Sequence, residues 1–109
     1  MAYDEGLAHR LGEALGALPG ITAKKMFGGI AFLWNGNMLV GVIGDDLIAR
    51  IGPDAQEDAL AQPGARVFDF TGRPMKGWVI VDGGAVSEDD VLEDWIGRAR
   101  EFVEALPPK

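Results

Sequence analysis

The chain has 109 residues, of which 48% are hydrophobic, and a formal net charge of −7, so its size fits one compact domain spanning residues 1–109. The acidic balance disfavours direct nucleic-acid binding, and the lack of cysteine excludes disulfides, thiolate metal sites and a cysteine nucleophile. No apolar run approaches the roughly 20 residues of a membrane-spanning helix, and the first residues do not resemble a secretory signal, so we expect a cytoplasmic protein without membrane contact.

An amphipathic helix is predicted from Asp4 to Leu18. Its apolar residues recur at three- and four-residue steps and share one side of the helix: Leu7, Leu11, Ala14, Leu15 and Leu18. Pro19 and Gly20 then end it. His9, the only histidine, falls on the polar side with no visible partner to orient it as a base, so we interpret it as a solvated surface residue.

The next segments predict an antiparallel meander. An extended lead-in at residues 21–26 precedes strands at 30–34, 38–43 and 47–51, and Asn35-Gly36-Asn37 supplies a hairpin loop. Both faces of these strands are largely apolar, whereas apolar and polar residues alternate in a half-exposed sheet. We therefore expect both faces to be covered, one by the chain's own helices and the other by a second subunit.

A short helix and two further strands follow the meander. Pro53 suits the first turn of a helix at residues 54–61, and residues 65–70 and 77–82 have the pattern of extended segments. The connection between these two segments is rich in cations and turn formers.

A long helix ends the chain. Ser87, with Asp90 three residues later, resembles a capping box, and the helix runs from there to about Ala105. Its apolar side comprises Val91, Leu92, Trp95, Ile96, Ala99, Phe102 and Val103. Together the elements predict an α+β fold with an antiparallel sheet of about five strands, in the order α-β-β-β-α-β-β-α, flanked by helices.

Two motifs suggest ligand sites but fit simpler interpretations. Gly28-Gly29 is followed by a strand and not by the helix that phosphate-binding loops require, so we favour a bulge or a close backbone approach. A cluster of acids lies at the start of the last helix, where acids complement the helix dipole, and it lacks the spacing of a calcium loop. The cluster comprises Glu88, Asp89, Asp90, Glu93 and Asp94. We predict no metal site and no cofactor.

Arg50 has the strongest case for a binding role. It stands inside the apolar strand at 47–51, where a cation is costly unless it reaches solvent, a carboxylate or a ligand. A position at the exposed edge of its strand would explain Arg50 without any ligand. If it lies near Arg73 and Lys76, the three cations beside Trp78 form an anion-binding surface.

Several of these features together resemble the TfoX/Sxy N-terminal domain family. They are the segment Lys24-Lys25-Met26-Phe27-Gly28-Gly29, the hairpin at Asn35-Gly36, the apolar strand with a cation at Arg50, the short helix, and Pro74-Met75-Lys76-Gly77-Trp78. The resemblance spans about residues 10–105 and implies a secretion-chaperone-like α+β fold. It also implies a link to transcriptional regulation of competence, in which full-length relatives work with a cyclic-AMP receptor protein.

The sequence differs from the family pattern in two ways. Arg50 stands where many relatives have lysine, and the printed sequence ends where longer members continue into a helical C-terminal domain. The family supplies no catalytic residues that could be carried over.

Two functional hypotheses follow. The first is a small non-enzymatic interaction domain that forms a homodimer, because its sheet is apolar on both faces, and that works with a protein partner in transcriptional regulation. The second is an anion or small-metabolite binding module that uses the basic surface around Arg50. An enzyme is not expected, because no histidine is placed to activate Ser87 or Thr71.

Overall fold

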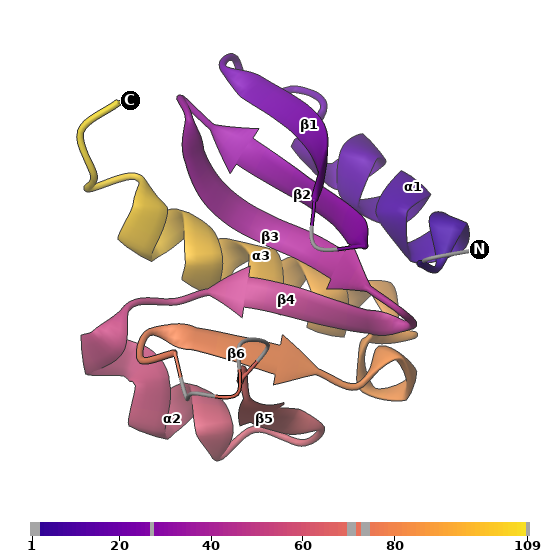
Figure 1. Ribbon diagram of the computed structural model, residues 1–109, viewed down its shortest axis with the longest axis vertical. Coiled ribbons are helices and arrows are strands. Elements are labelled where there is room, and N and C mark those ends of the chain that lie inside the picture. Colours follow the sequence, from indigo (N-terminus) through magenta and orange to yellow (C-terminus); the bar gives the residue numbers. More distant parts are fainter. Residues whose placement is uncertain (1–2, 27, 70–71, 73–74, 109) are drawn as a thin grey trace.

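The computed structural model describes residues 3–26, 28–69, 72 and 75–108. Six strands form one open antiparallel sheet in the order β1-β2-β3-β4-β6-β5, and helices flank it (Figure 1). The strands are β1 (Ile21–Met26), β2 (Gly29–Trp34), β3 (Asn37–Ile43), β4 (Asp46–Arg50), β5 (Ala65–Val67) and β6 (Trp78–Val81). The described helices are α1 (Glu5–Leu15), α2 (Gln56–Leu60) and α3 (Asp89–Val103), with short 3₁₀ turns η1 (Pro53–Ala55) and η2 (Gly83–Val86). The predicted α+β class is confirmed, and the lead-in becomes a sixth strand because it pairs with β2 along its whole length.

One face of the sheet carries the hydrophobic core. Side chains alternate along each strand, and those on this face form one apolar cluster with α1 and α3. The most deeply buried large members are Trp95, Leu11, Leu15, Leu39 and Leu47. Figure 1 views the sheet from the other side, so α1 and α3 lie behind the strands. The prediction that the chain's own helices cover one face is confirmed.

The first helix begins where the sequence predicts and ends earlier. The Oδ1 atom of Asp4 accepts hydrogen bonds from the N–H groups of Gly6 and Leu7, at 2.9 and 3.2 Å, which caps the start of α1. The helix ends at Leu15 and not at Leu18.

None of the described helices combines the length and the apolar character needed to cross a membrane.

The predicted capping box of the last helix is wrong. α3 begins at Asp89 with Glu88 as its N-cap, and no side chain caps it. Ser87 instead ends the η2 turn with helical backbone angles, so Glu88 and not Ser87 takes the N-cap position, and the Ser87 hydroxyl donates to the Gly84 carbonyl oxygen at 3.1 Å. The helix ends at Val103, slightly before the predicted end.

The remaining segments are shorter than predicted. The short helix divides into η1 and α2, and the strand expected at 65–70 is limited to β5, with residue 70 outside the described part of the chain. α2 packs against β5 and β6 at one end of the sheet.

The Gly28-Gly29 motif is a backbone feature. Gly28 has φ +76°, in the left-handed region that favours glycine. A Cβ atom added to Gly29 would lie 2.0 Å from the carbonyl oxygen of Val42 on β3. The close backbone approach predicted for this motif is therefore confirmed, and a side chain at Gly29 would force β2 and β3 apart.

Candidate functional site

The face of the sheet opposite the core has no described helix over β1 to β4 (Figure 1). Cross-strand pairing places one residue from each of the six strands in a single line, which we call the central row. It comprises Lys24, Ala31, Gly41, Ile48, Ile80 and Arg66. The row is apolar in its middle and has a cation at each end. The cation on β5, Arg66, pairs with Asp46 at 3.1 Å.

The apolar middle of the central row is buried. Ala31 and Ile48 are 0% exposed although no described helix covers them. A Cβ atom added to Gly41 would lie 3.1 Å from Met38 Cε, which shows that the Met38 side chain extends over this glycine. Leu33, Met38 and Ile43 remain half-buried. The result is a packed apolar surface with partly exposed side chains, which we call the open face.

Aromatic residues cover the β6 end of this side of the sheet. Phe68, just after β5, is 6% exposed, and its ring centroid lies 6.2 Å from that of Trp78 on β6. The Met75 N–H donates to the Phe68 carbonyl oxygen at 2.9 Å, so the described ends of this connection are joined to each other. The open face is therefore limited to β1 through β4 and the adjoining part of β6.

Arg50 lies at the border between these two regions. It pairs across the strands with Trp78, and its guanidinium carbon is 5.2 Å from the centroid of the Trp78 ring. The same carbon is 5.6 Å from the centroid of Phe102 on α3. We call these three residues the Arg50 clamp. Both distances fit cation–π contacts, so the aromatic rings stabilise a cation within an otherwise apolar strand.

The residues predicted to surround Arg50 have different outcomes. Trp78 is its direct neighbour, and Lys76 is exposed in the turn before β6. Arg73 lies outside the described residues. Phe102 was not predicted as part of this site, because its place in the apolar stripe of the last helix indicates core packing and gives no sign of its neighbour on β4.

Backbone geometry fixes the Arg50 clamp. Gly52 has φ +85°, and a Cβ atom there would lie 2.3 Å from the Phe102 ring, so only glycine lets this ring approach the end of β4. The N–H groups of Ile51 and Gly52 both donate to the Gly77 carbonyl oxygen, at 2.9 and 3.0 Å. Residues on either side of the clamp are thus tied to one another independently of the Arg50 side chain.

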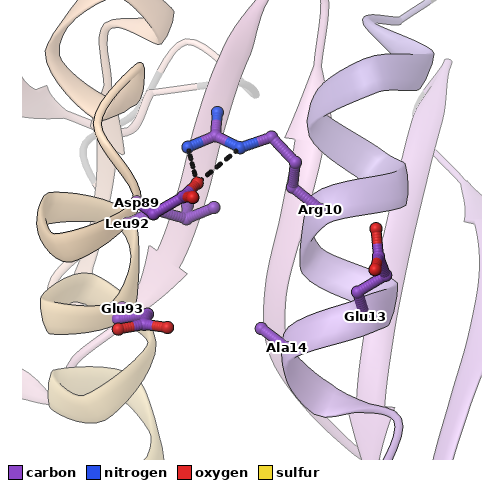
Figure 2. Close-up of a pocket in the computed structure, with 6 residues that line it drawn as sticks. All are labelled: Arg10, Glu13, Ala14, Asp89, Leu92 and Glu93. Carbon is purple, nitrogen blue, oxygen red and sulfur yellow. Dashed lines mark hydrogen bonds and ion pairs between the residues drawn. The ribbon is translucent and has the colours of Figure 1, made fainter.

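A separate pocket of about 310 Å³ lies between α1 and α3 (Figure 2). Arg10 reaches from α1 to Asp89 at the start of α3, with its Nε and Nη2 atoms 3.3 and 3.0 Å from Asp89 Oδ1. Glu13 and Glu93 line the pocket from opposite helices. Because its one cation is already paired, the pocket has an acidic lining and is unsuited to an anion.

Arg10 also holds the chain before α3, and this gives a test of what joins the two helices. Its Nη2 donates to the carbonyl oxygens of Val86 and Ser87 at 2.9 and 3.2 Å. We expect Arg10→Ala to lower the free energy of unfolding by about 2 kcal/mol, because these carbonyls lose a charged donor. Asp89→Ala should cost at most about 1 kcal/mol, because its side chain is 86% exposed. Urea unfolding measures both; equal losses would show that the ion pair, and not the carbonyl contacts, makes the link.

The interpretation of His9 as a solvated surface residue is confirmed, but His9 does have a partner, which was not predicted. His9 Nε2 lies 2.8 Å from Glu13 Oε1, one turn later on α1. The two side chains are 75% and 70% exposed, so water screens the pair. This geometry is that of a surface helix pair and does not create a buried base.

Two acids at the start of α3 form ion pairs, Asp89 with Arg10 on α1 and Asp94 with Arg98 within α3 itself. Asp94 binds Arg98 Nε at 3.0 Å, and Arg98 Nη1 reaches Asp58 on α2 at 2.9 Å. Hydrogen bonds raise the pKa of Arg98, and the bond with Asp94 contributes more than the bond with Asp58. Among the described residues, no group of three or more His, Cys, Asp or Glu side chains is placed to hold a metal ion.

Comparison with known proteins gives one match. The family model of the TfoX N-terminal domain matches residues 13–103. That range includes the Gly28-Gly29 motif, the whole central row and the Arg50 clamp. Neither the curated proteins nor the solved structures contain a match to the chain.

Proposed function

The chain belongs to the TfoX N-terminal domain family, and from this premise we propose that it is a small non-enzymatic regulatory domain that acts by contact with other proteins. The contact surface is the open face, through which two copies of the chain form a homodimer. A protein partner in transcriptional regulation then binds the resulting homodimer. The net charge of −7 supports regulation through a protein and not through direct contact with DNA.

The open face supports this proposal because no described helix lies over its apolar side chains, and several of them remain partly exposed. Half-buried Leu33, Met38 and Ile43 gain burial only if another surface meets them. The molecule measures 32 × 31 × 28 Å. The area of one whole face is therefore comparable to the roughly 800 Å² that each partner buries in a stable interface. A dimer must therefore use most of the width from β1 to β4.

Sedimentation velocity tests the homodimer. We expect the wild type to dimerise at low micromolar concentration and Met38→Glu to be monomeric, because the new carboxylate lies over Gly41 in the middle of the open face. Added salt should strengthen the wild-type dimer by screening the repulsion between two acidic copies.

Val67→Glu is the matched control for this experiment. Val67 is 37% exposed and pairs with Val79, whose side chain lies in the core, so it is on the other side of the sheet. This variant should dimerise like the wild type, and circular dichroism should show that both variants fold. A monomeric wild type would contradict the homodimer, and a dimer that persists in Met38→Glu would contradict the open face as its interface.

A further inference from the structure

Arg50 differs from the arginines that hold the fold together. Arg10, Arg66 and Arg98 each pair with at least one carboxylate. Within the described part of the chain, the Arg50 side chain has no hydrogen bond and no ion pair, although it is half-buried in a strand. Its guanidinium carbon lies over two aromatic rings. The protein therefore keeps an arginine with unused donors at a position where a cation is costly.

Cation–π contacts and hydrogen bonds use different parts of an arginine. A cation–π contact uses the charge of the guanidinium, whereas its N–H donors are used by hydrogen-bond acceptors. A guanidinium that contacts aromatic rings and has no acceptor keeps its donors for a carboxylate or phosphate group, with which arginine forms two parallel hydrogen bonds. Lysine cannot reproduce this fork, because its ammonium group is a single point of charge.

The surroundings of Arg50 reduce the cost of ordering it. Gly52 leaves room for the Phe102 ring. The Gly77 carbonyl oxygen, just before Trp78, accepts hydrogen bonds from the end of β4. The exposed Lys76 precedes that same glycine, so a second cation comes from the adjoining segment. A side chain that is already positioned loses less entropy when a ligand binds.

We propose that the Arg50 clamp is a binding site for an oxyanion, a carboxylate or phosphate group on a small molecule, which the Arg50 guanidinium contacts through two hydrogen bonds. This site goes beyond the proposed dimer, because Arg50 lies at the end of the open face and binds its ligand within one copy.

Nuclear magnetic resonance titration tests the site with two probes, inorganic phosphate and succinate, each against chloride at constant ionic strength. We expect at least one probe to shift the signals of the Arg50 Nε–H and the Trp78 indole N–H. Arg50→Gln should weaken binding at least about tenfold, the effect of losing hydrogen bonds from a charged donor. Binding of phosphate alone would indicate a phosphorylated ligand, and binding of succinate alone would indicate a ligand with a carboxylate. Binding of both would indicate a general oxyanion site.

Two further variants distinguish bidentate hydrogen bonding by the guanidinium from simple charge attraction. Arg50→Lys keeps the charge and should lose several-fold in affinity. Arg100→Gln is the matched control, because Arg100 also faces a tryptophan ring, at 5.7 Å from Trp34, but lies exposed in the last turn of α3. It should bind like the wild type. The proposal is overturned if neither probe binds, if Arg50→Gln binds as well as the wild type while remaining folded, or if Arg50→Lys retains full affinity.

Discussion

Replacing Gly29 by alanine is expected to lower the free energy of unfolding by about 2–3 kcal/mol. The added Cβ atom would lie 2.0 Å from the Val42 carbonyl oxygen, a contact that real Cβ atoms do not make. Because the obstacle is backbone, no side-chain rotation can relieve it. β2 and β3 would have to separate at the start of their pairing, next to the pair formed by Ile30 and Val42. Urea unfolding followed by circular dichroism measures the loss.

Gly28→Ala is the matched control for the Gly29 substitution. Gly28 has φ +76°, but nothing lies within 4 Å of the position a Cβ would take. Alanine should therefore cost only the strain of a left-handed backbone, about 1 kcal/mol. A loss at Gly28 as large as that at Gly29 would show that backbone freedom, and not the approach of β3, explains the glycine pair.

Trp95→Ala is expected to have the larger effect, about 3–5 kcal/mol. Trp95 is 2% exposed and lies on α3 within the core cluster, so its removal leaves a cavity between the helix and the sheet. Small domains are stable by only about 5–15 kcal/mol, so this variant should lose a large part of its stability and melt at a much lower temperature than the wild type. Thermal unfolding followed by circular dichroism measures the loss.

A conservative change and a surface change provide the comparison for Trp95. Trp95→Phe keeps most of the apolar volume and should remain folded with a smaller loss. Val67→Ala removes a side chain that is 37% exposed and should change stability by no more than about 0.5 kcal/mol. A Trp95→Ala protein as stable as the Val67 variant would mean that α3 does not depend on this residue for its attachment.

Local chemistry made most of the fold predictable. The leucine spacing of α1 and the turn around Asn35 and Gly36 each depend on residues a few positions apart. The extended lead-in at residues 21–26 was harder to classify, because a strand at the edge of a sheet is defined by its partner and not by its own pattern. The prediction of a capping box failed because Ser87 fits the motif but ends the preceding η2 turn, which places Glu88 at the N-cap.

The candidate site was predictable only in part. Arg50 could be identified as a candidate binding residue because it is a cation within an apolar strand. Its contact with Trp78 requires the pairing of β4 with β6, and its contact with Phe102 requires the docking of α3 against the end of β4. These contacts join residues far apart in the sequence, so no local pattern reveals them. His9 shows the opposite failure, because its partner Glu13 was only one helical turn away.

The open sheet has two edges, and its outer strands affect how copies of the protein can meet. β1 exposes Lys24 and Lys25 next to each other, and β5 is only three residues long. Charged side chains and very short strands at an edge oppose the addition of another strand. Growth of the sheet from one molecule to the next, the route to fibrillar aggregates, is thus hindered at both ends. Even at high concentration, copies are therefore expected to associate face to face and to remain a soluble, finite assembly.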